Sequence, residues 1–328
     1  MLDNQSPGLA DIQRLAKTLS QWLLRTPVVR CVALEEITGA RVFAKLEFLQ
    51  RTSTFKPRGA LAVMLSLSEA QRVAGVTAVS AGNHAIATAF AARELGVSAK
   101  VVMLKSASPL RVARCREFGA EVVLADDVHS AFALASEIRD LEHRFLVHPF
   151  EGPLTSLGTA TLGLEMCEQV PDLDVVLVPI GGGGLCSGVA AAVKQLKPAA
   201  HVYGIEPDGA DSMHRSFASG KPEAIEEVRT IADSLGAPFS LPYSYALCRR
   251  HVDTLLRVSD AELRSAMRWL YRELHMIVEP ACAASTAAAL GILRHELRDK
   301  TVVLVMCGSN IDWQTWRKHA MPEAADAA

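Results

Sequence analysis

The sequence predicts an α/β protein with two lobes, each built on a mostly parallel sheet, and a cleft between them. Short β-rich segments alternate with longer helical patterns, which indicates βαβ units. The alternation occurs in two separate series, so we expect two sheets. Half of the 328 residues are hydrophobic, which is enough for a substantial core.

The predicted elements follow in order from the N-terminus. Apolar residues at Leu9, Ile12, Leu15, Leu19 and Leu23 recur with the helical period and predict a helix over 9–24. A strand over 41–49 comes next. The first series has strands at 76–80, 100–104, 121–125 and 145–147, separated by helices at 84–95, 109–118 and 129–141. The second has strands at 174–180, 202–206, 255–258 and 301–307. Residues 212–244, rich in glycine and proline, are predicted to be a long irregular segment, either a binding loop or a surface insertion.

Composition excludes several classes of partner. The net charge is −2 and no basic block occurs, so nucleic acid and anionic membranes are poor partners. The seven cysteines are scattered without a Cys-x-x-Cys pair, which argues against a disulfide framework or zinc ribbon and fits the reducing cytoplasm. No signal peptide is expected, and the longest low-charge stretch, 281–293, is too short to cross a bilayer. We therefore expect a cytoplasmic protein that acts on a small molecule.

One lysine lies in an unusual setting. Lys56 follows Phe55 and precedes Pro57, and Gly59 leads into an apolar helical run. Proline disfavours the α region for the residue before it, so Lys56 is predicted to be extended. At a strand-to-helix edge its amine would point into the ligand crevice, where desolvation would suit it to Schiff-base chemistry. The alternative is an ordinary surface lysine.

Two further segments lie where a helix begins after a strand. Ser80 and Asn83 are capping residue types, and a helix N-terminus there would attract a substrate carboxylate; an ordinary Asn-capped helix is the alternative. Gly181–Gly184 precedes Leu185 and an apolar helix, which predicts a phosphate cradle rather than a merely permissive turn. The residues that follow match neither a Walker P-loop nor a dinucleotide fingerprint.

Two more candidates come late in the chain. Cys307 ends the last apolar strand, where side chains face the crevice, although a buried cysteine is often only a small hydrophobe. Glu279 precedes Pro280 at the start of a helix, where a carboxylate is favoured by the helix dipole alone.

Taken in this order, the motifs resemble those of the serine/threonine dehydratases, pyridoxal-phosphate enzymes of the tryptophan-synthase-β-like fold type II. The motifs that carry the resemblance are Phe55-Lys56-x-Arg58-Gly59-Ala60, Ser80-x-Gly82-Asn83-His84, Gly181 to Leu185, Glu279-Pro280-Ala281 and Cys307-Gly308-x-Asn310. The resemblance covers residues 8–315. It implies two parallel-sheet lobes with pyridoxal 5′-phosphate in the cleft, and a homodimer. It also implies a large cofactor domain of 1–64 plus 149–315, a small mobile domain of 65–148 and a tail of 316–328.

The resemblance also implies roles for individual residues. Lys56 would bond the cofactor and later move the Cα proton, and Phe55 would lie against the ring. The other cofactor contacts would be Asn83 at the 3′-oxygen, Gly181, Gly182, Gly183, Gly184 and Leu185 at the phosphate, Glu279 on the substrate side and Cys307 at the pyridine nitrogen. The substrate carboxylate would lie on Ser80, Ala81, Gly82, Asn83 and His84. A neutral thiol cannot hold a proton on the ring nitrogen as an aspartate would, so β-elimination is favoured over transamination.

Departures from the family pattern narrow the reaction. Ala81 stands where serine racemases carry their second acid/base, so racemisation should be weak or absent. Glu206 and Ala210 match ligands of metal-binding relatives, but Ser212 replaces the second carboxylate, so we expect no metal, with a divalent cation as the alternative. Thr159 and Cys282 replace a family glutamine and glycine near the substrate, which leaves the substrate side chain open.

These observations predict a pyridoxal-phosphate-dependent dehydratase, or ammonia-lyase, that converts a 3-hydroxy amino acid of the threonine/serine type to a 2-oxo acid and ammonia. Alternatives are an amino-acid racemase, a dehydratase for a β-aryl or β-carboxyl serine, and a catalytically silent cofactor-binding protein. A nicotinamide oxidoreductase is disfavoured by the glycine spacing.

Overall fold

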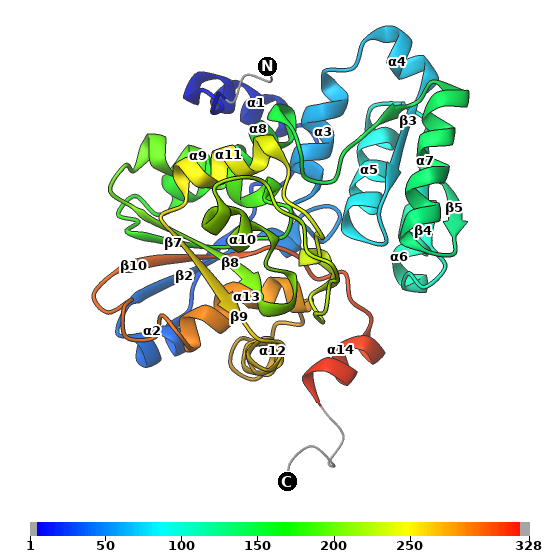
Figure 1. Ribbon diagram of the computed structural model, residues 1–328. Helices are drawn as coiled ribbons and strands as arrows, with labels where there is room; N and C mark the ends of the chain where they lie inside the picture. Colours follow the sequence, from blue (N-terminus) through cyan, green and yellow to red (C-terminus); the bar gives the residue numbers. More distant parts are fainter. Residues whose placement is uncertain (1–4, 322–328) are drawn as a thin grey trace.

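A computed structural model describes residues 5–321 and contains two sheets, one in each lobe (Figure 1). The larger lobe has a six-stranded sheet in the order β1-β2-β10-β7-β8-β9. Its strands are β1 (Val28–Arg30), β2 (Arg41–Leu46), β7 (Val175–Pro179), β8 (His201–Pro207), β9 (Thr254–Val258) and β10 (Thr301–Met306). The smaller lobe has the order β5-β4-β3-β6, formed by β3 (Val76–Val79), β4 (Ala99–Leu104), β5 (Glu121–Ala125) and β6 (Phe145–Leu146). All pairings are parallel except β1 with β2.

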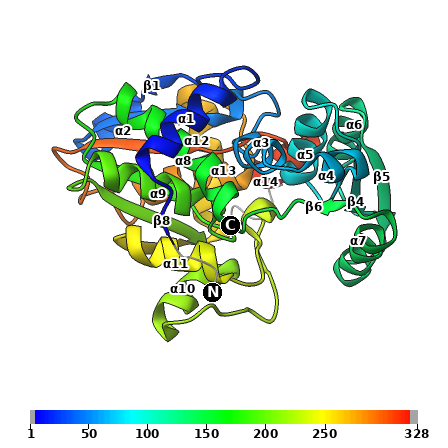
Figure 2. The same ribbon diagram turned by 90° about the horizontal axis from the view of Figure 1, so that it is seen from above.

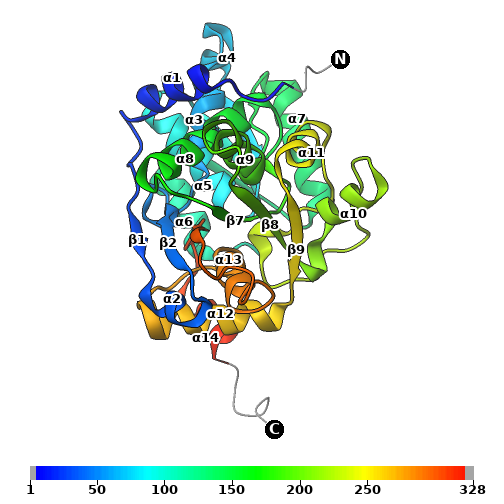
Figure 3. The same cartoon turned by 90° about the vertical axis from the view of Figure 1, so that its left-hand side faces the viewer.

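Helices cover the sheets of both lobes. The smaller lobe carries α4 (Glu69–Ala74), α5 (Asn83–Glu94), α6 (Pro109–Glu117) and α7 (Val128–Glu142) and stands apart from the rest when seen from above (Figure 2). On one face of the large sheet lie α8 (Pro153–Gln169), α9 (Gly184–Leu196) and α11 (Pro242–His251); on the other lie α2 (Val32–Thr38), α12 (Asp260–Leu274) and α13 (Pro280–Leu290) (Figure 3). The remaining helices are α1 (Leu9–Leu19), α3 (Pro57–Leu65), α10 (Ser212–Ser219) and α14 (Trp313–Ala320).

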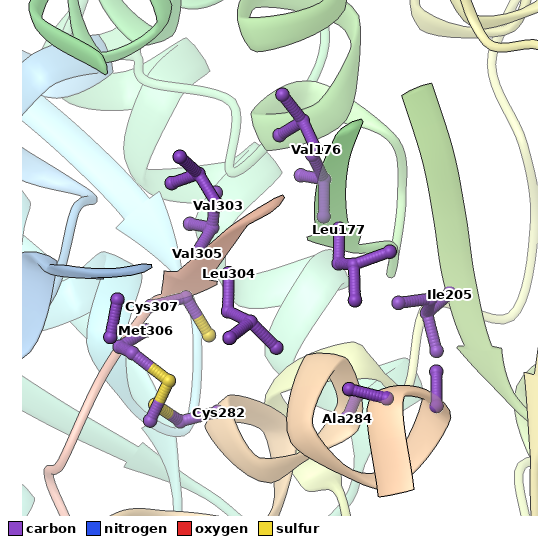
Figure 4. Packing of buried hydrophobic residues seen from close by; sticks show 14 of the residues in the cluster. Val176, Leu177, Ile205, Cys282, Ala284, Val303, Leu304, Val305, Met306 and Cys307 are labelled. Atoms are coloured by element: carbon purple, nitrogen blue, oxygen red, sulfur yellow. The ribbon is translucent and has the colours of Figure 1, made fainter. Parts of the chain in front are cut away.

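In the core of the larger lobe, successive side chains of the central strands point to opposite faces of the sheet. Val303 and Val305 of β10 point to one face and Leu304 to the other, where α13 packs (Figure 4). Small side chains such as Ala284 let α13 lie close to the sheet. Because both faces are covered, these strands are continuous hydrophobic runs, which is why the sequence revealed them.

The two-lobed parallel fold is confirmed, but several local predictions were wrong. The first helix ends at Leu19, and the strand from Arg41 ends at Leu46, where a short 3₁₀ turn, Glu47–Leu49, begins. The antiparallel strand β1 was not predicted. Residues 212–244 are not wholly irregular, since they contain α10 and a 3₁₀ turn, Asp233–Leu235.

The C-terminal end of the chain was also predicted incompletely. The expected tail begins inside α14, where Trp316 is fully buried, and residues 322–328 lie outside the described part. Within residues 5–321 no helix combines the length and apolarity needed to cross a membrane.

A buried ion network joins four elements of the larger lobe. Arg58 of α3 donates to both oxygens of Glu47, at 2.7 and 2.9 Å, and to both oxygens of Glu165 of α8, at 2.8 and 3.0 Å. Lys45 of β2 donates to Glu165 at 2.6 Å. Burial raises the pKa of Glu47, but the charge and hydrogen bonds of Arg58, together with Lys45 and Thr26, lower this pKa by more, so the carboxylate stays ionised. Two positive and two negative charges therefore compensate one another.

Removing one charge of this network should strongly destabilise the fold. For Glu47→Gln we expect a loss of about 3–5 kcal/mol in the free energy of unfolding, because Arg58 and Lys45 then share the single carboxylate of Glu165 and one buried positive charge is left uncompensated. The control is Glu168→Gln, the same chemical change in an exposed pair with Arg25, which should cost under about 1 kcal/mol. Urea unfolding measures both, and equal losses would contradict the buried network's role.

Candidate active site

Lys56 lies immediately before α3, and its backbone is helical. Its φ of −53° and ψ of −32° contradict the predicted extended conformation. The Arg58 N–H donates to the Phe55 carbonyl at 3.1 Å and the Ala60 N–H donates to the Lys56 carbonyl at 3.2 Å. The first turn thus begins before Pro57, and its hydrogen bonds outweigh the steric preference of the residue that precedes a proline.

The amine of Lys56 lies in a small cavity between the lobes. It donates to the Pro149 carbonyl at 2.7 Å and lies 5.2 Å from the centre of the Phe55 ring. Other residues that line the cavity are Gly59, Ala60, His84, His148, Thr155, Thr159 and Gly184. Burial lowers the pKa of Lys56 to about 8, although Cys307 and Glu279 oppose the shift. The amine can therefore release and accept a proton near neutral pH.

The segment before Lys56 is joined to the end of β10. The Phe55 N–H donates to the Cys307 carbonyl at 3.2 Å, and the Ser309 N–H donates to the Ser53 carbonyl at 3.0 Å. Cys307 is buried, and both its contact with the Cys282 thiol and burial raise its pKa. Cys307 is therefore a neutral thiol, held next to the lysine segment by main-chain hydrogen bonds.

Asn83 and Ser80 do not cap α5 as predicted. The N-cap is Gly82 and receives no side-chain cap, while the Ser80 hydroxyl accepts from the Gly82 N–H at 3.1 Å. Instead, the Asn83 amide crosses to the larger lobe. It donates to Glu279 at 2.7 Å and to Ser234 at 3.2 Å, and accepts from Asn310 at 2.7 Å.

Glu279 precedes α13 and is almost completely buried, with 1% of its surface exposed. Its Oε1 accepts from Asn83, but its Oε2 has no hydrogen-bond partner among residues 5–321 and lies 3.6 Å from the Arg111 guanidinium. Burial raises the pKa of Glu279 to about 7, against the opposing charge of Arg111. A buried carboxylate oxygen without a donor suits a polar ligand in the cleft.

The glycine loop is shaped by close approach. A Cβ at Gly182 would lie 2.3 Å from the Phe150 ring, and one at Gly184 would lie 2.4 Å from the Phe150 carbonyl. Gly183 has φ of +91°, a conformation that favours glycine. Leu185, buried in the first turn of α9, follows directly. The loop brings the N-terminus of α9 to the cavity, where N–H groups attract an anion such as phosphate.

The two histidines of the cavity are uncharged. Burial and the nearby Lys56 charge lower the pKa of His84 to about 3 and that of His148 to about 4. His84 Nε2 lies 2.8 Å from the Val147 carbonyl, and Thr159 donates to the Gly184 carbonyl at 2.7 Å. Among the residues that line the cavity, Lys56 is thus the one cationic group.

The predicted site residues therefore gather at one place, but the sequence did not reveal three contributors. Arg111 and Asp233 form an ion pair beside Glu279, and Phe150 packs on the glycine loop. Arg111 follows Pro109 at a helix start beyond a strand of the smaller lobe, which is a weak signal by itself. Asp233 begins a three-residue 3₁₀ turn and Phe150 lies in a loop, and both segments are too short to carry a periodic pattern.

Glu206, which was predicted as a metal ligand only in the alternative, accepts main-chain hydrogen bonds instead. Its two oxygens accept the N–H groups of Met213 and His214 at 2.8 and 2.7 Å and so cap α10. Asp211 accepts from Arg215 at 2.8 Å and from Arg257 at 3.1 Å. Ala210 and Ser212 are buried nearby, and in the described part of the chain no cluster of three His, Cys, Asp or Glu residues could hold a metal. The donor set does not fit a divalent cation, which prefers several carboxylate oxygens.

Comparison with known proteins agrees with this geometry. The family model of pyridoxal-phosphate-dependent enzymes matches residues 19–308. The chain is 53% identical to phenylserine dehydratase of Ralstonia pickettii over 95% of this chain and 96% of that protein. It is 36% identical to L-threonine ammonia-lyase of Thermotoga maritima, over 93% of this chain and 76% of that protein.

Solved structures show the same fold. A threonine deaminase from T.th. superimposes with a TM-score of 0.87 and 36% identity, over 94% of this chain and 99% of that one. Maize serine racemase superimposes with a TM-score of 0.90 and 32% identity, over 96% and 98% of the two chains. These matches exclude the nicotinamide oxidoreductase. The chain belongs to the pyridoxal-phosphate-dependent enzymes of fold type II, among the serine/threonine dehydratases that act on 3-hydroxy amino acids.

Proposed function

We propose that this enzyme dehydrates a 3-hydroxy amino acid with an aromatic β-substituent, a phenylserine-type substrate, to a 2-oxo acid and ammonia. The observation that carries the proposal is the composition of the cavity around Lys56. Its lining residues have mostly aromatic or small side chains, and Lys56 is the one positively charged group among them. Beside the cavity, the His148 ring packs edge-on to the Phe150 ring with 4.7 Å between the ring centres, and the centre of the Phe239 ring lies 6.2 Å from that of Phe150. Aromatic rings pair favourably with one another, so this wall suits an aryl group.

A β-carboxyl substrate is the less favoured alternative. Such a substrate brings a second carboxylate, which needs a positive partner once it leaves water. One candidate, Arg111, is already paired with Asp233 and lies 3.6 Å from Glu279. Its single charge therefore faces two carboxylates and is not available for a third.

The residues present fit the cofactor, and we assign their roles accordingly. Lys56, Phe55, Asn83, the Gly181–Gly184 loop with Leu185, Glu279 and Cys307 would hold it, and the 80–84 loop would receive the substrate carboxylate at the start of α5. When bound, pyridoxal phosphate supplies an electron sink for the electrons released at Cα. Lys56 Nζ, with a pKa of about 8, removes the Cα proton, and the electron pair left at Cα forms a double bond to Cβ as the Cβ–O bond breaks. The β-hydroxyl leaves as water with a proton that balances the one taken by Lys56, and a water molecule then hydrolyses the released enamine to the 2-oxo acid and ammonia. The neutral thiol of Cys307 would offer the cofactor's ring nitrogen no ionic partner, which would favour rapid elimination.

Racemisation is disfavoured because the face of the site opposite Lys56 lacks a second acid. The fold alone does not separate the two reactions, because a serine racemase shares it. Ala81 carries a methyl group where a second acid would have to return a proton to Cα. Lys56 therefore acts alone, as the base of an elimination.

We also propose the assembly and location of the enzyme. The large domain comprises 1–64 plus 149–315 and the small domain 65–148, which moves as a unit. A homodimer is proposed from the resemblance to the dehydratases. Seven free cysteines, all buried, fit a cytoplasmic enzyme.

Lys56→Ala should abolish turnover and the visible absorption band of the purified holoenzyme, because both depend on the Lys56 amine. The matched control is Lys105→Ala, an exposed lysine on the smaller lobe, which should keep both. Absorption spectra and a 2-oxo-acid assay measure the outcome. A wild type that carries no cofactor, or a Lys56→Ala variant with full turnover, would contradict the assignment.

The substrate panel should favour the aryl group. We expect kcat/KM for phenylserine to exceed that for threonine and serine by at least about tenfold, since pocket contacts discriminate by about this factor per group. 3-Hydroxyaspartate should be the poorest substrate. Chiral analysis of recovered substrate should show retained configuration, whereas loss of configuration faster than oxo-acid formation would support the racemase.

Removal of divalent cations should leave activity unchanged. Both carboxylate oxygens of Glu206 and both of Asp211 already accept hydrogen bonds from protein donors. We therefore expect no bound cation at these residues for a chelator to remove. Activity is measured in EDTA and in added Mg²⁺ at constant ionic strength. A loss in EDTA that Mg²⁺ restores would show that a cation site exists.

A further inference from the structure

Arg111 is a buried arginine of the smaller lobe whose polar partners all belong to the larger lobe. It lies on α6, and 7% of its surface is exposed. Its Nε donates to the Asn310 carbonyl at 3.0 Å, its Nη1 pairs with Asp233, and its Nη2 lies 3.6 Å from Glu279. One side chain therefore connects the lobes at three points.

The same guanidinium packs on the loop expected to hold the substrate carboxylate. A Cβ at Gly82 would lie 2.9 Å from Arg111 Nη1 and 3.2 Å from its Cζ. Any side chain at this position would displace the guanidinium, so Gly82 and Arg111 fit each other. Arg111 thus touches the 80–84 loop, the carboxylate of Glu279 and the segment that follows Cys307.

The chemistry of arginine explains why one residue can make these contacts. Its planar guanidinium directs five donors in fixed directions, whereas a lysine ammonium is a compact point charge on a flexible chain. Its charge is compensated only while the lobes are together, because Asp233, Glu279 and Asn310 lie across the cleft. Separation of the lobes would remove the Arg111 charge from the buried carboxylate of Glu279, which is costly when one partner stays out of water.

We propose that Arg111 is a positioning residue that closes the smaller lobe over the site and orients Glu279 and the 80–84 loop toward the substrate. It does not exchange protons or touch the reacting atoms. This inference rests on the proposed dehydratase function for its kinetic readout, but not for its conformational readout. Ser108 of the same segment donates to Asp312 at 3.3 Å and extends the contact between the lobes.

The test uses three variants of the holoenzyme. Arg111→Lys keeps a charge but loses the planar donors, Arg111→Gln loses both, and Arg114→Gln is the control on the same helix, where Arg114 is 38% exposed and pairs with Glu117. Both Arg111 variants should raise KM and lower kcat, with kcat/KM reduced at least about tenfold, the size expected for a misplaced site. The control should match the wild type.

Chymotrypsin digestion provides the readout that does not depend on turnover. L-Alanine has the amine and carboxylate of a substrate but no leaving group, so it should protect the smaller lobe of the wild type and of Arg114→Gln. Both Arg111 variants should lose this protection while thermal unfolding of each stays within a few degrees of the wild type. If wild-type enzyme dehydrates no 3-hydroxy amino acid, the proposed function fails while the protection assay still tests Arg111. Protection and kinetics at wild-type levels in Arg111→Gln would overturn the proposal.

Discussion

The active site depends on the buried ion pairs of Arg58 with Glu47 and Glu165, which anchor the helix that begins directly after Lys56. Arg58 lies in the first turn of α3, two residues after Lys56, so the same ion pairs that anchor this helix also fix the lysine. Lys45 completes the charge balance through Glu165. A catalytic amine must be placed within a fraction of an ångström, and a network of full charges away from water provides that rigidity. We propose that the lobe that carries Lys56 is the fixed part of the enzyme.

The smaller lobe contributes polar groups that reach across to this fixed part. Asn83 and Arg111 come from different helices, and both converge on Glu279. Glu279 is consequently the meeting point of the lobes as well as a group with a pKa near neutrality. Substrate binding and the lobe closure proposed above would therefore both depend on the ionisation of this carboxylate.

The sequence predicted the architecture well and the contacts of the site poorly, for a physical reason. Buried strands such as Val175–Pro179 and Thr301–Met306 are local hydrophobic runs, and the glycine loop is a local composition signal. The helical backbone of Lys56 was mispredicted because the hydrogen bonds of the first turn outweigh the preference of a residue that precedes proline. The partners of Asn83 lie far along the chain, and local rules do not contain them. Arg111 was missed because its partners are more than one hundred residues away.

The position of β10 has a consequence for how the protein is made. This strand, at Thr301–Met306, pairs with β2 on one side and β7 on the other, so the last strand within residues 5–321 completes the middle of the large sheet. The smaller sheet, by contrast, is formed from strands between Val76 and Leu146 and can fold early on the ribosome. The large sheet must wait with a gap beside β2 until β10 has been synthesised. A nascent chain therefore has no complete catalytic site before β10 has left the ribosome.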